Sequence, residues 1–266
     1  MDQSSNETRI PAVLTADQMI ALDRLAETLF ERRSGVAFTG AGISTESGIP
    51  DYRGPNGRWK RMPPPDFRSF LTDPERRLNH WRHRQERYPE MAAKQPNAGH
   101  YALAKLQQLG YIQEIITQNI DGLHQKAGSD PATVIELHGS VHQVRCLDCG
   151  RLFDADPFDR AFNGEEPGCP VCGGMVKEST ISFGQSLVAE DLRTALTLAR
   201  GTGVMLVVGS SLTVNPAAKV PREAARSGAI LAIINNEPTP LDGIAEILAH
   251  TPAGAALTYL VDALNP

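Results

Sequence analysis

Short apolar runs and longer amphipathic stretches alternate along most of this chain. The sequence Thr15-Ala-Asp-Gln18 has the spacing of a helix capping box and begins an apolar stripe at helical period. A short apolar run at 36–39 follows and ends at Gly40-Ala41-Gly42, which predicts a strand, a turn and the start of a helix. Asn97 then precedes a second helical stripe, which is predicted to stop at Gly110.

Four further apolar runs have the length of buried strands, and segments of helical character near 187–200 and 217–227 separate the later ones. Strands that alternate with helices indicate a mostly parallel, doubly wound sheet. We therefore predict an α/β fold with a Rossmann-like domain assembled from three stretches of chain. The four runs are 112–117, 134–137, 204–208 and 230–234, and the three stretches are 15–53, 96–142 and 179–266.

Two insertions do not follow this alternation. Residues 54–95 contain Pro63-Pro64-Pro65, many arginines and only weak periodicity, which indicates a helical module. Residues 143–178 contain all four cysteines of the chain. We expect these two insertions to form a smaller domain together, and residues 1–14 to form a polar tail.

Composition excludes several classes of function. No apolar run is long enough to cross a bilayer, so no membrane partner is expected. The net charge of -5 argues against dependence on a nucleic-acid backbone. The first eight residues are polar and show none of the features of a targeting peptide, which favours a cytoplasmic location.

The cysteines form two Cys-x-x-Cys pairs, Cys146 with Cys149 and Cys169 with Cys172. Two such pairs in a short stretch supply the four thiolates that a tetrahedral zinc ion requires. Because four thiolates leave no open coordination position, the zinc is expected to be structural. Disulfides and a redox role are less favoured, since every cysteine belongs to a pair and a reducing compartment is expected.

Glycines and polar residues follow the ends of five predicted strands. In open α/β sheets the carboxyl ends of the strands form the ligand crevice, so these loops predict one shared binding site. The five loops are Gly40-Ala41-Gly42, Gln118-Asn119-Ile120-Asp121, His138-Gly139, Gly209-Ser210-Ser211 and Asn235-Asn236-Glu237.

The first of these loops, which continues to Ser44, could bind a pyrophosphate through its backbone N–H groups. Thr45 occupies the place of the third glycine in the dinucleotide fingerprint, so a tight structural turn is the alternative. Asp51 and Arg53 follow in the same segment as candidate ligand contacts. The alternative for these two residues is a surface salt bridge.

The second and third loops carry the candidate catalytic groups. Gln118 to Asp121 could hold a ribose and a carboxamide, and the alternative is a capped helix start. His138 is the best candidate for a general base, because an imidazole with a pKa near ~6.5 accepts a proton at neutral pH. A purely structural histidine is the alternative, which its place among the converging loops disfavours. The other histidines are assigned surface or packing roles, with His124 the least certain.

Together these motifs resemble the sirtuins, the family of NAD-dependent protein lysine deacylases. Tyr52 and Gln185 depart mildly from the family's common Phe and Glu. The segment Gln95-Pro-Asn-Ala-Gly-His100 and the pair Leu147-Asp148 resemble class II members. The matching segments, which span roughly 15–262 in the family's order, are 40–53, 117–121, 136–139, the four cysteines, 182–184, 209–211 and 235–237.

The resemblance implies that NAD lies across the strand ends, with a zinc ion as the second cofactor. In the implied reaction the acyl-lysine oxygen attacks ribose C1′ as nicotinamide leaves, and His138 removes a proton from a ribose hydroxyl. That hydroxyl attacks the acyl carbon, and the products are lysine, nicotinamide and O-acyl-ADP-ribose. Asn119 is the second implied catalytic residue and, with Asp121, would hold the nicotinamide ribose and carboxamide.

The resemblance also implies a set of contacts and partners. The partner is an acyl-lysine protein or peptide, paired as an added strand, and the protein is expected to be a monomer. Implied substrate contacts are Ile181, Phe183, Gly184 and Val214. Implied cofactor contacts are Gly40, Ala41, Gly42, Ser44, Asp51, Tyr52, Arg53, Gln118, Asn119, Ile120, Asp121, Gly209, Ser210, Ser211, Asn235, Asn236, Glu237 and Ala253.

Two alternative functions remain open at this point. Mono-ADP-ribosylation of a protein would use the same cofactor and site, and an NAD-sensing scaffold would use the site without catalysis. A dehydrogenase is less favoured because the third fingerprint glycine is absent. Sirtuins that prefer acidic acyl groups carry a Tyr-x-x-Arg pair. Trp81 and Arg84 align with that pair here, so the Tyr of the pair is absent. Desuccinylation is therefore not expected, and core packing is the alternative role of Trp81.

Overall fold

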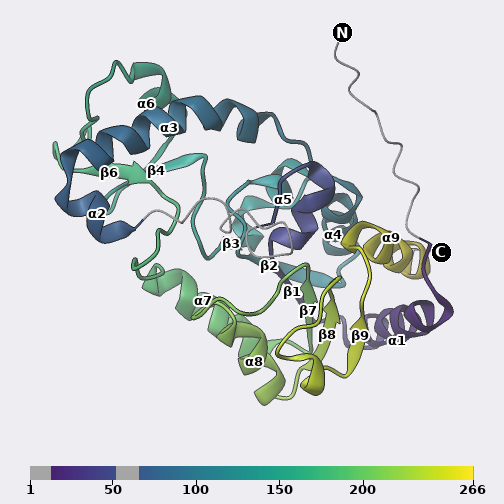
Figure 1. Cartoon of the computed structure of the whole chain (residues 1–266). Coiled ribbons are helices and arrows are strands. Elements are labelled where there is room, and N and C mark those ends of the chain that lie inside the picture. The colour runs from purple at the N-terminus through teal and green to yellow at the C-terminus, as the bar shows by residue number, and fades with distance from the viewer. Residues whose placement is uncertain (1–12, 52–65, 266) are drawn as a thin grey trace, which may run out of the picture.

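The computed structural model describes residues 13–51 and 66–265, so Tyr52 and Arg53 lie outside the described residues. Within those ranges, six parallel strands form one sheet in the order β3-β2-β1-β7-β8-β9 (Figure 1). The strands are β1 Gly35–Thr39, β2 Ile112–Thr117, β3 Val134–Glu136, β7 Val204–Val208, β8 Ile230–Ile234 and β9 Ile247–Ala249.

All five strands predicted from the apolar runs are present, to within one residue at each end. The sixth strand, β9, was missed because three residues give too short an apolar run to stand out. The chain builds outward from β1 to β3, then returns to β7 on the other side of β1 and builds outward to β9. This is the Rossmann-like order, in which a crevice opens where the direction of building reverses. The predicted fold class is confirmed.

Helices cover both faces of the large sheet. On one face lie α1 (Ala16–Arg32), α4 (Ala98–Gln108) and α9 (Ala253–Leu264), and on the other lie α7 (Ala189–Gly201) and α8 (Lys219–Arg226) (Figure 1). Alternate strand residues serve the two cores, since successive side chains of a strand point to opposite faces. In β1, for example, Ala37 joins the first core, whereas Val36 and Phe38 join the second.

Local capping explains where two of these helices begin. The Thr15 side chain accepts from Gln18 N–H and the Gln18 side chain accepts from Thr15 N–H, as the capping-box pattern predicted. Asn97 caps α4, which ends just before Gly110, a residue with a φ of 77°. Shorter elements are α5 (Leu123–Lys126) and the 3₁₀ helices η1 (Ala41–Ser47), η3 (Pro131–Thr133) and η4 (Asp242–Ile244).

A smaller module contains α2 (Phe67–Thr72), α3 (Pro74–Ala93), α6 (Asp156–Ala161) and an antiparallel sheet in the order β5-β4-β6. Its strands are β4 Gln143–Cys146, β5 Leu152–Asp154 and β6 Val176–Glu178. Trp81 of α3 is 1% exposed and packs in a separate core with Val144 and Phe158. The packing role of Trp81 is therefore the one that the structure supports.

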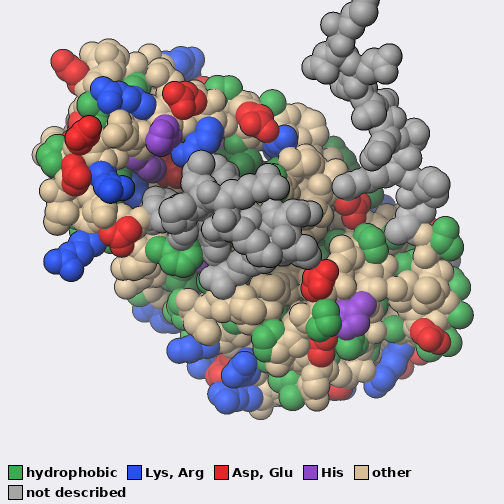
Figure 2. Space-filling view, in the orientation of Figure 1, with side chains coloured by type: hydrophobic (Ala, Val, Ile, Leu, Met, Phe, Trp, Pro, Cys, Tyr) green, Lys and Arg blue, Asp and Glu red, His purple; other side chains and the backbone are tan. Residues whose placement is uncertain are grey.

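Among the described residues, no helix combines the length and the apolar character needed to span a membrane. Figure 2 shows Lys and Arg side chains interspersed with Asp and Glu side chains on the displayed face.

Candidate active site

A cleft of about 2380 Å³ lies beside the carboxyl ends of the central strands and faces the smaller module. Each of the five predicted loops contributes residues to its wall, and this volume exceeds the ~300–1,000 Å³ typical of small-molecule pockets. The predicted positions on the wall are Gly40, Ala41, Gly42, Asp51, Gln118, Asn119, Ile120, His138, Ile181, Phe183, Gly184, Gly209, Ser210, Ser211, Val214, Asn235, Asn236, Glu237 and Ala253.

The first and fourth loops touch through their glycines. Gly42 N–H donates to the Gly209 carbonyl at 2.8 Å. A Cβ on Gly42 would lie 2.7 Å from Gly209 Cα, and a Cβ on Gly209, whose φ is 61°, would lie 2.3 Å from Ile43 N. Both positions therefore require glycine. The predicted helix start after Gly40 is a 3₁₀ helix, η1, held in this close contact.

Behind this wall, Ser44 and Asp121 form a buried hydrogen-bond network with Asn119. The Asn119 amide donates to the Gly40 carbonyl at 3.1 Å and to Ser44 Oγ at 3.0 Å. The Ser44 hydroxyl in turn donates to Asp121 Oδ2 at 2.7 Å. Because both amide hydrogens of Asn119 are used, its Oδ1 is the group that it can offer to a ligand. Ser44 and Asp121 are 1% and 4% exposed, so they act from behind the cleft surface.

Two buried histidines extend this network. His100 Nδ1 accepts from Asn97 N–H, so its Nε2 carries the proton toward Ser44 Oγ, 3.4 Å away. His124 Nε2 lies 2.9 Å from Thr39 Oγ1. Burial lowers the pKa of His100 to about 4 and that of His124 to about 3, so both rings are neutral near pH 7.

Sequence reasoning gave these histidines surface or packing roles and so missed their polar contacts. One signal was available for the first of them. His100 stands three residues after the helix cap Asn97, which is the position whose side chain returns to the cap in a capping box. No comparable signal marks His124, whose partner Thr39 is distant in the sequence.

His138 has the geometry of a general base. Its Nδ1 lies 2.9 Å from the Gln118 carbonyl oxygen. A carbonyl only accepts, so Nδ1 carries the proton and Nε2 retains a free lone pair. Burial lowers the pKa of His138, although the bond to Gln118 partly opposes that effect. The ring lines the cleft and is neutral near pH 7, which is the state that can accept a proton.

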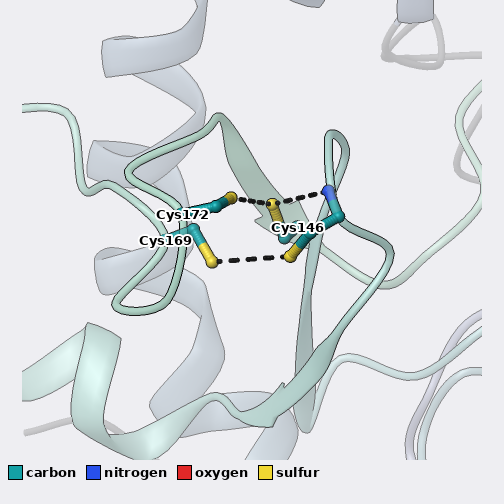
Figure 3. A group of neighbouring side chains, drawn as sticks. Cys146, Cys169 and Cys172 are labelled. Carbon is teal, nitrogen blue, oxygen red and sulfur yellow. Dashed lines mark hydrogen bonds between the residues drawn. The ribbon is translucent and has the colours of Figure 1, made fainter.

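The four cysteines converge as the spacing predicted (Figure 3). Their Sγ atoms all lie within 4.8 Å of one another, with 3.5 Å between Cys146 and Cys172 and 3.8 Å between Cys149 and Cys169. A tetrahedron with Zn–S bonds of ~2.3 Å has S–S edges of ~3.8 Å, so the thiol set fits zinc. None of the four is among the described residues of the cleft wall, which supports a structural site.

Arg84 of α3 is held by three hydrogen bonds to carboxylates. Its Nε and Nη2 each lie 2.8 Å from the Asp159 carboxylate, and its Nη1 lies 2.8 Å from Glu178 Oε2. The guanidinium carbon also lies 4.3 Å from the centre of the Tyr88 ring. The Arg84 side chain is 2% exposed, so this cation is committed to the smaller module.

Comparison with known proteins adds independent findings. A profile of the Sir2 family matches residues 40–216. The chain is 43% identical over 246 residues to NAD-dependent protein deacetylase 1 of Bradyrhizobium diazoefficiens, covering 92% of this chain and 97% of that protein. It is 41% identical over 241 residues to NAD-dependent protein deacylase 2 of Pyrobaculum aerophilum, covering 90% and 94%.

Solved structures show the same likeness. A solved structure that concerns the mechanism and regulation of Sir2 enzymes superposes with a TM-score of 0.80 at 39% identity. The superposition covers 92% of this chain and 98% of the other. A complex of Sir2 with a p53 peptide and NAD⁺ superposes with a TM-score of 0.77 at 36% identity, covering 90% and 96%.

Proposed function

Because the chain belongs to the Sir2 family, we propose that it is an NAD-dependent protein deacetylase that acts on acetyl-lysine side chains. Relatives of both kinds of name, deacetylase and deacylase, match almost the whole chain, and one similar structure holds a peptide together with NAD⁺. The cleft has room for both a dinucleotide and a peptide segment.

The observation that carries this proposal is the orientation of His138. Its Nδ1–H is committed to the Gln118 carbonyl, so Nε2 is the base available to a group in the cleft. Asn119 lines the same cleft, and its Oδ1 is the group that it can offer as a hydrogen-bond acceptor. A neutral imidazole and a fixed acceptor are suited to deprotonating and orienting a ribose hydroxyl.

The residues present fit NAD. The close contact of Gly42 with Gly209 brings main chain to the cleft surface, where the pyrophosphate would lie at the start of η1. Asn119 would hold the nicotinamide ribose, with Asp121 and Ser44 fixing the Asn119 amide from behind. When bound, NAD supplies the sugar carbon that takes the acyl oxygen as nicotinamide leaves.

We propose that the acetyl-lysine peptide lies along Ile181–Gly184. Ile181 N–H donates to the His138 carbonyl at 2.8 Å, which ties this segment to the base. The Phe183 carbonyl accepts from Phe67 N–H at 2.9 Å, so the protein occupies one side of the segment. A peptide strand would therefore add near Gly184, with Val214 on the same cleft.

Three finer assignments accompany this proposal. The first is membership of class II, which is supported by the segment 95–100 and by the pair Leu147-Asp148. The thiol cluster supports one structural zinc ion in a reducing, cytoplasmic setting. We also predict, from the composition and the family, that the protein binds no nucleic acid and is a monomer.

The test is incubation of the purified protein with an acetyl-lysine peptide, with and without NAD, followed by mass spectrometry. Loss of the acetyl group with stoichiometric nicotinamide and O-acetyl-ADP-ribose supports the proposal. A mass gain of one ADP-ribosyl unit on an acceptor protein, without deacetylation, would favour mono-ADP-ribosylation instead. NAD binding with neither product would favour the non-catalytic scaffold.

A further inference from the structure

Residues 138–142 hold the backbone of the loop Gln118–Asp121 at three carbonyl groups. His138 Nδ1 bonds to the Gln118 carbonyl at 2.9 Å, and Val141 N–H donates to the Ile120 carbonyl at 2.9 Å. The third bond, from His142 Nε2 to the Asp121 carbonyl at 3.0 Å, comes from a side chain to which the proposed reaction gives no role.

The direction of hydrogen bonding through His142 is determined by its partners. The Asp121 carbonyl only accepts, so His142 Nε2 carries a proton and donates it there. In the tautomer that carries its proton on Nε2, Nδ1 is the acceptor, and the Tyr88 hydroxyl, 3.0 Å away, donates to it. The bonds therefore run in one direction, from Tyr88 of α3 through His142 to Asp121.

The first two members of this chain are themselves anchored. The Tyr88 ring lies against the guanidinium of Arg84, which Asp159 and Glu178 hold in the smaller module. His142 is fixed through its main chain, since its carbonyl accepts from Ala155 N–H.

The packing around His142 also requires a glycine beside it. A Cβ on Gly122 would lie 2.8 Å from His142 Cδ2, and Gly122 has a φ of 68°. At the other end of the chain, Asp121 accepts from Ser44, and Ser44 accepts from the Asn119 amide. The ring of His142 is thus fitted closely against the loop that carries Asn119.

We propose that Tyr88 and His142 are positioning residues for the nicotinamide-ribose end of the NAD site. They fix Asp121, and through Ser44 they fix the amide of Asn119, so the loop keeps one position relative to helix α3. This inference rests on the proposed function for the identity of the ligand. It assigns to α3 a part in cofactor binding besides its place in the smaller module.

The test compares NAD affinity, measured by titration calorimetry, with steady-state kinetics. Tyr88→Phe removes one hydroxyl and keeps the ring, so NAD affinity should fall about fivefold, the effect of one lost hydrogen bond. KM for NAD should rise by the same factor while KM for the acetyl-peptide stays unchanged. Tyr259→Phe is the matched control, because it removes a hydroxyl bonded to Asp23 at 2.7 Å on α1, away from the cleft.

A second pair of variants separates positioning from folding. His142→Leu should weaken NAD binding at least as much as Tyr88→Phe, and His142→Gln, whose amide can still donate to Asp121, should recover part of the loss. The Tyr88→Phe/His142→Leu double variant should bind NAD no more weakly than His142→Leu alone, because both act through one chain.

The outcomes separate this inference from the proposed function. A wild-type enzyme that deacetylates normally, with unchanged NAD affinity in Tyr88→Phe, overturns the inference alone. Additive losses in the double variant, or an equal loss in Tyr259→Phe, overturn it as well. If the wild type binds NAD without deacetylating and Tyr88→Phe still weakens binding, the proposed function fails and the inference stands. A wild type that does not bind NAD overturns both.

Discussion

The imidazole of His138 and the main chain of Gln118 form one unit through a 2.9 Å bond between Nδ1 and the carbonyl oxygen. That bond fixes both the tautomer of the ring and its orientation toward the cleft. It also ties the base to the loop that carries Asn119, so the two proposed catalytic groups hold a constant relative position. Such preorganisation is what a proton transfer during acyl removal requires.

Replacing His138 should therefore abolish turnover and spare cofactor binding. In His138→Ala the base is absent, and deacetylation should fall by at least ~100-fold, the usual contribution of a general base. NAD binding by calorimetry should persist, because the glycine loop and Asn119 are intact.

The matched variant is His138→Asn, whose side-chain amide can still donate to the Gln118 carbonyl but cannot act as a base. It should lose activity as fully as the alanine variant, with a thermal unfolding midpoint closer to that of the wild type. Turnover at the wild-type rate in either variant would contradict the role of His138.

Removing the Ser44 hydroxyl should weaken catalysis through Asn119. Ser44→Ala deprives the Asn119 amide of an acceptor and Asp121 Oδ2 of a donor, both of them buried. An unsatisfied buried polar group costs about 1–3 kcal/mol, so kcat/KM for NAD should fall about 5- to 150-fold. Ser227→Ala, at the exposed end of α8, is the control and should change nothing. Equal kinetics for the two variants would show that the Ser44 network is dispensable.

The large sheet could be predicted because its strands are buried on both faces and so appear as continuous apolar runs. In β7 all five residues from Val204 to Val208 are buried. The cleft could be predicted because its residues directly follow such strands, as His138 follows β3. Gly42 and Gly209, which are hydrogen-bonded to each other, likewise follow the apolar runs at 36–39 and 204–208.

The polar network behind the cleft could not be predicted in the same way. His124 meets Thr39, and His142 meets Tyr88, only after folding brings distant segments together. No local period marks such pairs. Arg84 illustrates a related limit, since the sequence aligned it with the Arg of a Tyr-x-x-Arg pair but gave no sign of its partners. Its three carboxylate contacts come from Asp159 and Glu178, far along the chain.

Acidic acyl groups should be poor substrates. A succinyl carboxylate needs a free cation in the cleft, and Arg84 is already bound by Asp159 and Glu178. Releasing it would take the guanidinium away from two half-buried carboxylates, which is costly. On a panel of acetyl-, long-chain-, lipoyl- and succinyl-lysine peptides of one sequence, nicotinamide release should be at least ~10-fold slower for succinyl than for acetyl. Comparable kcat/KM values for the two would show that another cation serves the acyl site.

Removal of zinc should inactivate the enzyme by loss of structure. Two of the ligands, Cys146 and Cys169, belong to the core that also contains Trp81, so releasing the ion should loosen that core. A strong chelator should lower the thermal unfolding midpoint and activity together, and Cys149→Ser should do the same with reduced zinc content by elemental analysis. A zinc-free protein of full activity and unchanged midpoint would contradict a structural role.

Buried histidines should make the protein less stable as the pH falls below 6.5. Burial lowers the pKa of His80 and His100 to about 4 and that of His124 to about 3, from 6.5 in the unfolded chain. Between these pKa values the unfolded chain binds protons that the folded protein excludes. The contribution of these histidines to the free energy of unfolding is therefore fully present above pH 6.5 and is lost as the pH falls. Glu136 acts in the opposite sense, because burial raises its pKa from 4.5 to about 7 and the folded protein retains its proton.

These three histidines against Glu136 contribute a net uptake of about two protons on unfolding near pH 5.5, or about 2–3 kcal/mol per pH unit. The lowered pKa of His138 adds to this uptake, and the raised pKa values of Glu114 and Asp191 oppose it. Urea unfolding at pH 7, 6 and 5 measures this slope. The slope should become shallower by about one proton in His124→Gln and steeper by about one proton in Glu136→Gln, because each variant removes one titrating group of known sign. Changes in the opposite directions, or a wild-type stability that rises between pH 6 and pH 5, would show that the histidines are not held neutral in the folded protein.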